Sequence, residues 1–191
     1  PGLATALRRP VRRKTEAVPA VAFISSNWDA SGRREYMQEL ASLIPVDAYG
    51  GFMRNRTLKH DRGAVSKRAA LARYRFTLAF ENAIARDYVT EKFYDPLIAG
   101  SVPVYLGAPN IADFAPGEHA YIDARDYPSP VELASHLRQI ADDEDAYRAY
   151  HAWKKRSFRP AFEELLALSR IHPFARLCQR LSRLWGEPNQ S

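Results

Sequence analysis

Residues 76–107, FTLAFENAIARDYVTEKFYDPLIAGSVPVYLG, are the part of the chain that decides the fold. The apolar runs at 76–80 and 102–107 are rich in aromatic and β-branched residues, as buried strands are. Between them, residues 90–99 are typical of a helix, which Gly100 would end. A strand, a helix and a second strand in this order predict two parallel strands joined by a helical crossover.

The same alternation of strands and helices extends along most of the chain. Further strands are expected at 20–25, 46–49 and 120–123, and further helices at 32–44, 63–74 and 129–141. Ser129 and Glu132 form the N-cap and the closing residue of a capping box at the start of the last of these helices. This order indicates the α/β class, with a parallel sheet covered by helices on both faces.

Polar and small residues follow each of the first four expected strands. They are Ser26-Asn27, Gly50-Gly51, Glu81-Asn82 and Gly107-Ala108-Pro109-Asn110. In open α/β sheets, ligands bind beyond the carboxyl ends of the strands. The sequence therefore predicts a ligand site at this edge of the sheet, where residues 87–92 also lie.

Residues 87–92, DYVTEK, place an unusual amount of hydrogen-bonding chemistry in one strand-to-helix turn. If Thr90 caps the helix, Glu91 and Lys92 lie in its first turn, where free N–H groups and the helix dipole attract anions. Lys92 would supply a positive charge for a diphosphate, and the two oxygens of Glu91 suit a ribose diol. The alternative is structural: the dipole alone favours an acidic residue there, and Lys92 is solvated. The chain contains neither a G-x-G-x-x-G nor a P-loop motif.

The composition is that of a globular chain with one domain and appendages: 191 residues, 46% hydrophobic and 26% charged. The net charge of +6 gathers near the two ends, while the middle is nearly balanced. No nucleic-acid-binding motif accompanies this charge, so nucleic acid is not an expected partner. The basic residues at the ends include Arg8, Arg9, Arg12, Arg13, Lys14, Arg176, Arg180 and Arg183.

Cysteine and histidine usage limits the chemistry of the site. The single cysteine, Cys178, excludes an internal disulfide framework and a cysteine-based zinc site, and it favours a reducing compartment. The five histidines have no metal-ligand spacing, so no metal site is expected. No apolar run approaches the roughly 18 residues of a membrane span, and the chain does not open on a signal peptide.

Three motifs in a fixed order carry a resemblance to a known family. They are F-E-N (80–82), D-Y-V-T-E-K (87–92) and G-x-P-N-x-x-D-F-A-P (107–116). From about Val18 to Lys154, the chain closely resembles the α-1,3-fucosyltransferases of glycosyltransferase family ten. The resemblance implies that this chain is the C-terminal, Rossmann-like half of a two-domain GT-B fold, the half that holds GDP-fucose.

The same resemblance implies roles for individual residues. Glu91 would hold the ribose hydroxyls, Lys92 would meet the phosphates or the fucose, and Tyr88 would line the pocket. Arg33 best matches the phosphate-binding arginine of the family, with Arg34 as a one-residue alternative. The implied donor-binding residues are Ser26, Asn27, Arg33, Asn82, Tyr88, Glu91 and Lys92. No catalytic residue or metal ligand is assigned, and GDP-fucose is expected as donor substrate without a required cofactor.

The implied reaction is an inverting transfer of fucose to a glycan hydroxyl, α-1,3 on acceptors of the N-acetylglucosamine type. In the family, the general base is a glutamate of an N-terminal acceptor domain, which is absent from these residues. The chain is therefore expected to be the donor-binding domain of a glycosyltransferase. The alternative is a truncated, non-catalytic module that binds a nucleotide sugar. The lone Cys178 favours a cytoplasmic, bacterial-type enzyme, whereas an animal-type enzyme would be in the Golgi.

We expect three segments: a flexible basic arm or linker at 1–17, the donor-binding domain at 18–156, and a helical tail at 157–191. In the tail, Phe174, Leu177, Cys178, Leu181, Leu184 and Trp185 share one face of a helix, apart from Arg176, Arg180 and Arg183. One interpretation is a helix that packs on this domain or on the acceptor domain. The other is peripheral contact of residues 174–185 with an anionic membrane, the inner membrane in a bacterial cell.

Overall fold

The computed structural model describes residues 2–185, which are built around a five-stranded sheet. The strands are β1 (Ala20–Ala22), β2 (Val46–Ala48), β3 (Phe76–Phe80), β4 (Val102–Leu106) and β5 (Ile122–Asp123). Their order in space is β2-β1-β3-β4-β5, and every neighbouring pair is parallel. The predicted parallel sheet is confirmed, although β1 and β5 are shorter than expected.

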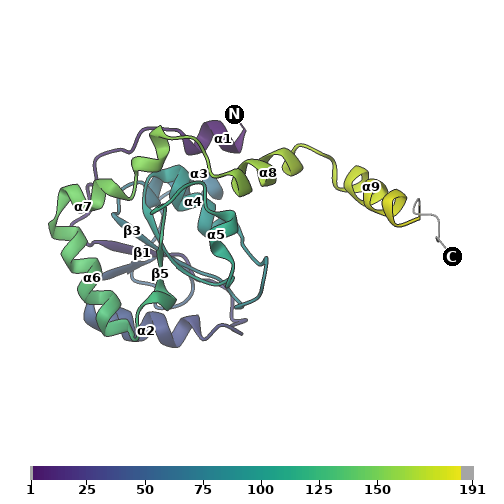
Figure 1. The fold of residues 1–191 in the computed structure, drawn as a ribbon. Coiled ribbons are helices and arrows are strands. Elements are labelled where there is room, and N and C mark those ends of the chain that lie inside the picture. Colours follow the sequence, from purple (N-terminus) through teal and green to yellow (C-terminus); the bar gives the residue numbers. More distant parts are fainter. Residues whose placement is uncertain (1, 186–191) are drawn as a thin grey trace.

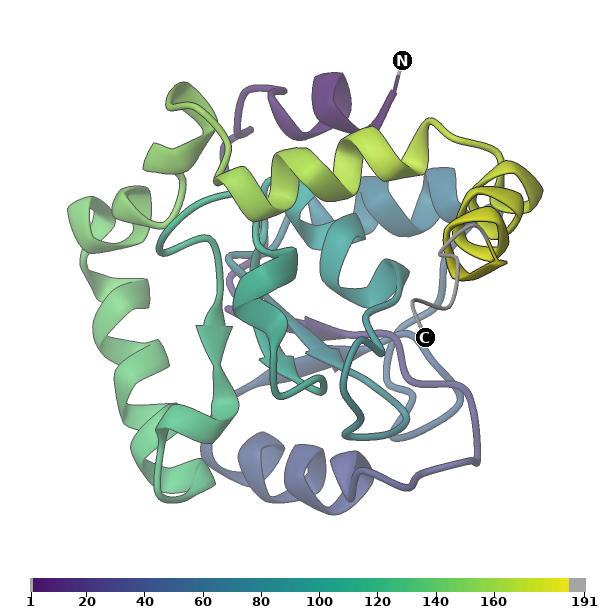
Figure 2. The same cartoon turned by 45° about the vertical axis from the view of Figure 1, so that its right-hand side comes forward.

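Helices cover both faces of the sheet, as predicted (Figures 1 and 2). α2 (Arg33–Leu43) and α6 (Pro130–Asp142) pack on one face; α3 (Ala64–Leu71), α4 (Glu91–Ala99) and α5 (Ile111–Phe114) lie on the other. Short elements that the sequence did not indicate are α1 (Leu3–Leu7), α5, and the 3-10 helices η1 (Ala124–Asp126) and η2 (Ala152–Lys155). The short helix α7 (Glu144–Ala149) begins at the acidic run of residues 142–145. The layers therefore follow the order helix, sheet, helix.

The strand order creates a crevice between β1 and β3. From β1 the chain crosses to β2 on one side, and from β3 it crosses to β4 on the other side. The loops that follow β1 and β3 therefore diverge, and this topological switch point is where doubly wound sheets bind ligands. The predicted site residues that follow these two strands are thus brought to one place.

Alternating side chains of β3 pack in two different apolar clusters. Phe76 and Phe80 of β3 pack in the core beneath α2 and α6, whereas Ala79 faces Phe93 of α4 and Tyr105 of β4. Phe93 is fully buried and lies edge-on to the Tyr105 ring at a centroid distance of 5.2 Å. This packing fixes the position of α4, whose first turn carries part of the site.

The helix signals in the sequence act as expected. The Thr90 hydroxyl caps α4 by accepting a hydrogen bond from the backbone N–H of Lys92, and Gly100 ends the helix in the left-handed conformation at φ 77°. Ser129 caps α6 and also bonds the carboxylate of Glu132, which completes the predicted capping box. Local sequence therefore determines where these two helices begin.

The segment expected as a flexible basic arm instead lies against the domain. Leu7 of α1 is fully buried, and the Lys14 ammonium donates to the carbonyls of Ala72 (3.1 Å) and Gly100 (2.5 Å). The backbone N–H of Thr15 donates to a carbonyl beside β3. These contacts hold the segment in place, and its boundary at residue 17 stays a prediction.

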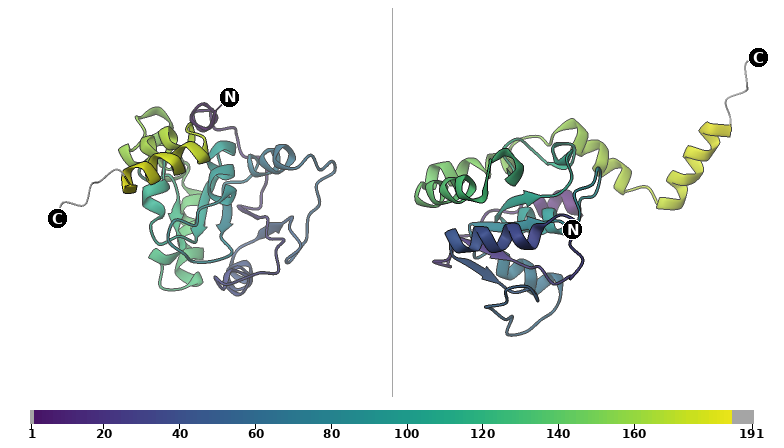
Figure 3. Two further views of the ribbon diagram at one scale, coloured as in Figure 1. Left: turned by 90° about the vertical axis from the view of Figure 1, so that its right-hand side faces the viewer. Right: turned by 90° about the horizontal axis from the view of Figure 1, so that it is seen from below.

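The C-terminal tail contains α8 (Pro160–Ser169) and α9 (Pro173–Trp185), and α9 points away from the sheet (Figures 1 and 3). Phe174 and Leu177, from the predicted apolar face, are exposed by 72% and 52%. The side chains of Arg183, Leu184 and Trp185 lie outside the described residues. Along the part of the chain that is described, no helix combines the length and apolarity needed to cross a bilayer.

Replacing Phe93 with alanine should lower the free energy of unfolding by about 3–5 kcal/mol, because it removes a fully buried ring and leaves a cavity. Urea unfolding of both proteins measures the difference. Val131→Ala on α6, where the valine is 51% exposed, is the matched control and should change stability by less than about 0.5 kcal/mol. Equal effects of the two changes would contradict this packing.

Candidate functional site

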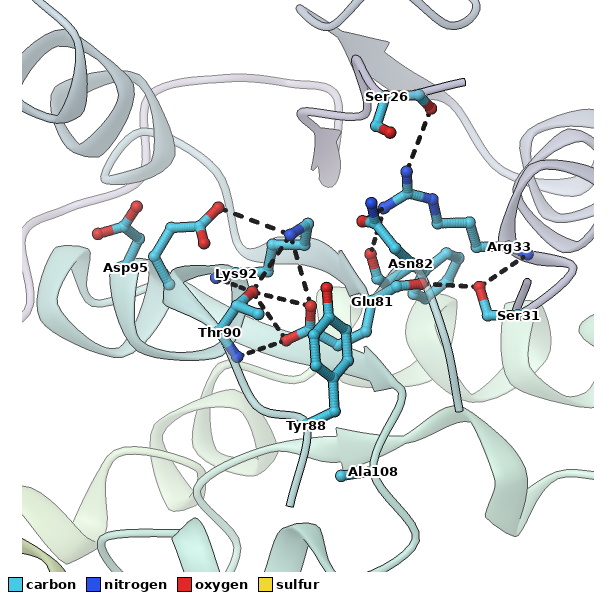
Figure 4. Close-up of polar contacts among 12 residues, drawn as sticks. Ser26, Ser31, Arg33, Glu81, Asn82, Tyr88, Thr90, Lys92, Asp95 and Ala108 are labelled. Atoms are coloured by element: carbon cyan, nitrogen blue, oxygen red, sulfur yellow. Dashed lines mark hydrogen bonds and ion pairs between the residues drawn. The ribbon is translucent and has the colours of Figure 1, made fainter. Parts of the chain in front are cut away.

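Two loops meet at the carboxyl edge of the sheet, one after β1 and one after β3 (Figure 4). The backbone N–H of Ala30 donates to the carbonyl of Asn82 over 2.8 Å, and the Ser31 hydroxyl donates to the carbonyl of Glu81 over 2.7 Å. These two bonds hold the loop after β1 against the residues that follow β3.

Arg33, the first residue of α2, is buried inside this junction and is only 1% exposed. Its guanidinium donates to the carbonyls of Ser26 (3.2 Å), Trp28 (3.3 Å) and Phe80 (3.2 Å) and to the side-chain oxygen of Asn82 (2.5 Å). Nε of Arg33 has no partner among the described residues. Arg33 therefore binds the β1 loop to the end of β3, and its side chain points inward.

The burial of Arg33 is compensated by nearby carboxylates. Burial lowers the pKa of Arg33, and the charges of Asp29 and Glu81 oppose this shift. The Asp29 carboxylate also accepts hydrogen bonds from the backbone N–H groups of Arg33 and Arg34, both at 3.0 Å. The amino end of α2 is thus already occupied by a carboxylate of the chain itself.

The other predicted residues of the β1 and β3 loops, Ser26, Asn27 and Asn82, differ in their exposure and in their hydrogen bonds. Ser26 and Asn27 are exposed, and Asn27 has no hydrogen bond to any described residue. Asn82 is half-buried, and because its oxygen is bonded to Arg33, its amide N–H groups remain to donate. Asn82 therefore presents donors to the crevice.

Glu81 is the residue at the centre of the site that the sequence argument left without a role. It is fully buried, and its carboxylate accepts hydrogen bonds from the backbone N–H (2.8 Å) and the hydroxyl (2.8 and 3.0 Å) of Thr90. The ammonium of Lys92 lies 3.4 Å from the same carboxylate. Glu81 therefore attaches the N-cap of α4 to the end of β3. The signal in the sequence was an acidic residue directly after a buried strand.

Lys92 and Glu91 lie in the first turn of α4, as predicted. The Lys92 side chain is 20% exposed, and its ammonium contacts the hydroxyl of Thr90 (3.2 Å) as well as Glu81. The Glu91 side chain is 59% exposed, and its carboxylate lies 3.7 Å from Lys92 and 3.5 Å from Lys67 of α3. Partial burial raises the pKa of Glu91, but the two ammonium groups outweigh it and leave that pKa below its ordinary value. Glu91 is thus an ionised acceptor facing solvent.

Tyr88 completes the group on the β3 side. Its ring lies edge-on to that of Trp28 from the β1 loop, at a centroid distance of 6.5 Å, and its hydroxyl points to the side where Lys92 and Asn82 lie (Figure 4). Trp28 is 56% exposed, which is high for so large an apolar side chain. The crevice is therefore bordered by an aromatic pair, a cation, a carboxylate and an amide.

The structure brings most of the predicted residues together, in two groups. Ser26, Arg33 and Asn82 are joined by direct hydrogen bonds, and Glu91 and Lys92 are neighbours that Glu81 connects to β3. Asn27 is beside the first group without contacting it. Among residues 2–185, no group of three or more histidine, cysteine, aspartate or glutamate side chains is placed to hold a metal ion.

A doubly wound parallel sheet with a polar crevice at its switch point defines a Rossmann-like domain. The sequence from residue 11 to residue 190 matches the family described as glycosyltransferase family 10 (fucosyltransferase), C-terminal. The chain belongs to this family of glycosyltransferases, as the three motifs had indicated.

Known relatives are longer than this chain. A fucosyltransferase-like protein of Arabidopsis thaliana is 39% identical over 170 residues, which cover 88% of this chain and 32% of the relative. GDP-fucose protein O-fucosyltransferase 3 of Homo sapiens is 40% identical over 141 residues, 70% of this chain and 29% of the relative. Alpha-(1,3)-fucosyltransferase B of Drosophila melanogaster is 36% identical over 144 residues, with coverages of 71% and 32%. The chain thus spans about a third of each relative.

Solved structures confirm the fold. A crystal structure of alpha1,3-fucosyltransferase with GDP-fucose superposes with a TM-score of 0.63 at 22% identity, covering 85% of this chain and 48% of that one. A crystal structure of alpha1,3-fucosyltransferase with GDP gives 0.60 at 25% identity, with coverages of 71% and 38%. The domain is therefore one half of a GT-B fold.

Replacing Glu81 with glutamine should lower the free energy of unfolding by about 1–3 kcal/mol, because the buried carboxylate that receives the Thr90 and Lys92 contacts loses its charge. Chemical denaturation provides the measurement. Glu164→Gln, at an exposed position of α8, is the isosteric control and should leave stability unchanged. If Glu81→Gln behaved like this control, Glu81 would not hold the end of β3 to α4.

Proposed function

We propose that this chain is the donor-binding half of a fucosyltransferase and that its ligand is GDP-fucose. The observation that carries the proposal is the meeting of Asn82, Tyr88, Glu91 and Lys92 at the switch point of the sheet, in a chain of this family. Crystal structures of alpha1,3-fucosyltransferases with GDP and GDP-fucose support the choice of ligand.

Each residue offers a group suited to one part of the donor. The exposed Glu91 carboxylate accepts two hydrogen bonds from a ribose diol. The Lys92 ammonium lies in the first turn of α4, where the helix dipole also favours the charge of a diphosphate. Ser26 and Asn27 offer polar groups from the loop after β1, Asn82 offers its amide from the end of β3, and Tyr88 provides a ring at the border.

Arg33 and Arg34 are the two candidates for the phosphate-binding arginine, and their side chains point in different directions. Arg33 contacts three carbonyls and Asn82, and these contacts support a role in positioning Asn82. Its Nε has no partner among the described residues and is the atom that would contact a phosphate. Arg34 is half-buried and stacks over the ring of Phe52 at 4.5 Å, so its guanidinium points to the loop after β2. We therefore keep Arg33 as the donor-site arginine.

The proposed reaction is a single displacement at the anomeric carbon of fucose, with inversion. The bond from this carbon to the GDP oxygen breaks as the acceptor oxygen attacks, and the electron pair leaves with GDP. Lys92 and the positive end of the α4 dipole would stabilise the growing charge on the leaving diphosphate. A glutamate of an acceptor domain would take the proton of the acceptor hydroxyl.

The acceptor and the cellular location stay predictions. The name of the Drosophila relative supports an α-1,3 linkage, whereas the human relative's name favours a protein hydroxyl. The N-acetylglucosamine-type acceptor stays a prediction. Peripheral membrane contact of residues 174–185 rests on the exposed Phe174 and Leu177. A cytoplasmic location rests only on the lone Cys178, and metal stimulation of transfer is untested.

Glu91→Ala should weaken GDP binding by about tenfold or more, because two charge-assisted hydrogen bonds to the ribose are lost. Isothermal titration calorimetry measures the affinity. Glu39→Ala, an exposed carboxylate on α2, is the matched control and should bind like the wild type. An unchanged affinity in Glu91→Ala would contradict the ribose contact.

A full-length protein that carries this chain should consume GDP-fucose with N-acetyllactosamine as acceptor, whereas this chain alone should bind GDP without transferring fucose. The reason is that the proposed base belongs to the acceptor domain. Product analysis with this glycan and with a serine- and threonine-containing protein acceptor distinguishes the two acceptor classes. GDP binding without transfer to either acceptor by the full-length protein would favour the non-catalytic alternative.

A further inference from the structure

A basic cavity lies at the edge of the sheet opposite the candidate donor site. It has a volume of about 1180 Å³ and is formed where residues 8–14 run past α7 and η2 (Figure 1). Arg75, which lines it, directly precedes β3, whereas Glu81 directly follows this strand. At about 3.3 Å per strand residue, β3 keeps the two sites more than about 15 Å apart.

The charge of the cavity is almost entirely positive. The one carboxylate that lines it, among the described residues, is Glu144, and this is already shared by Arg75 (3.0 Å) and Arg148 (3.3 Å). The cationic lining residues are Arg8, Arg9, Arg12, Arg13, Lys14, Arg75, Arg148, Lys154, Lys155 and Arg156. The lining therefore contains ten basic side chains and one carboxylate, and this carboxylate is paired with only two of them.

Several of these cations are fixed by the fold itself. The Lys154 ammonium is buried and donates to the carbonyls of Leu7 (2.7 Å) and Leu97 (2.8 Å), and Lys14 likewise donates only to carbonyls. Arg8 donates to the carbonyls of Trp153, Lys154 and Arg156. These bonds satisfy the donors but leave the positive charges without a counter-charge.

The other cations are free to bind a ligand. Arg9, Arg12, Arg13 and Lys155 are exposed, and none of them forms an ion pair with a described residue. Deeper in the lining, Nε2 of His151 is buried and has no hydrogen-bond partner in the described part of the chain. A polar atom buried without a partner costs free energy that a ligand could recover.

We propose that this cavity is a second anion site, which binds a ligand carrying two or more phosphate or sulfate groups. The arginines of residues 8–14 offer planar donors that match tetrahedral anions, and the amine groups of Lys14 and Lys154 also line the cavity. A single small anion would leave most of these cations unpaired, so the geometry fits a multivalent ligand.

The protonation of the buried groups agrees with an unmet demand for negative charge. Burial, with Lys154 and Arg75 nearby, lowers the pKa of Lys14 to about 7, and burial with Arg8 nearby lowers that of Lys154 to about 8. Burial and the charges of Lys14 and Lys154 lower the pKa of His151 to about 3. A bound polyanion would favour the charged forms of both lysines and offset this cost.

Binding of inorganic tripolyphosphate to the purified full chain, measured by calorimetry, tests the site. Replacing both Arg12 and Arg13 by alanine should weaken binding about tenfold or more, because charge-assisted contacts of two exposed side chains are lost. The buried contacts of Lys14 and Lys154 stay intact, so the fold should be unchanged. The control pair Arg170→Ala and Arg176→Ala removes the same charge from the tail and should bind like the wild type. Lys92→Ala, at the candidate donor site, should also leave most of the affinity intact.

The result that overturns the proposal is an Arg12→Ala, Arg13→Ala protein that binds tripolyphosphate like the wild type, or an equal loss in the tail control. A loss confined to Lys92→Ala would overturn it as well, since binding would then occur at the other edge of the sheet. Two further binding measurements distinguish a soluble ligand from a lipid. One uses inositol hexakisphosphate, and the other compares vesicles of phosphatidylserine with vesicles of phosphatidylcholine. Dependence on Arg12 and Arg13 with the soluble compound indicates a free polyanion, and dependence with the anionic vesicles alone indicates lipid headgroups.

Discussion

The buried charge of Arg33 is the constraint on which the rest of the site depends. Taking a guanidinium out of water costs several kcal/mol unless its donors and its charge are both satisfied. Carbonyls at the ends of β1 and β3 and the oxygen of Asn82 satisfy four donor contacts, and Asp29 and Glu81 supply the opposing charge. Since the connections after β1 and β3 lead to opposite sides of the sheet, the contacts of Arg33 hold the beginnings of these two connections together.

Glu81 performs the complementary task on the other side of the crevice. Its backbone carbonyl is bonded to Ser31 of the β1 loop, while its carboxylate holds Thr90 and Lys92 of α4. One residue therefore links both loops to the first turn of the helix. A buried carboxylate in this position also prevents Lys92 from moving into solvent, so its ammonium faces the crevice at little cost in side-chain entropy.

The sequence predicts those parts of the fold that local physics controls. Caps such as Thr90 and Ser129 act within a few residues, and the apolar runs of the strands are buried wherever they occur. Long-range contacts decide the rest. Nothing near Lys14 in sequence reveals that it reaches the carbonyls of Ala72 and Gly100, so a packed segment resembled a flexible arm. The family resemblance selected Arg33, but its inward direction depends on contacts with Phe80 and Asn82, 47 and 49 residues further along the chain.

Buried positive charges are compensated differently at the two edges of the sheet. At the carboxyl edge, Lys92 lies 3.4 Å from the Glu81 carboxylate, and the charges of Asp29 and Glu81 oppose the effect of burial on Arg33. At the amino edge, Lys14 and Lys154 are bonded to carbonyls alone, and Glu144 serves only the arginines beside it. Carbonyl dipoles satisfy hydrogen-bond donors without cancelling a unit charge, so the field there remains open toward the cavity. The anion that this edge lacks within the described chain is therefore expected from outside it.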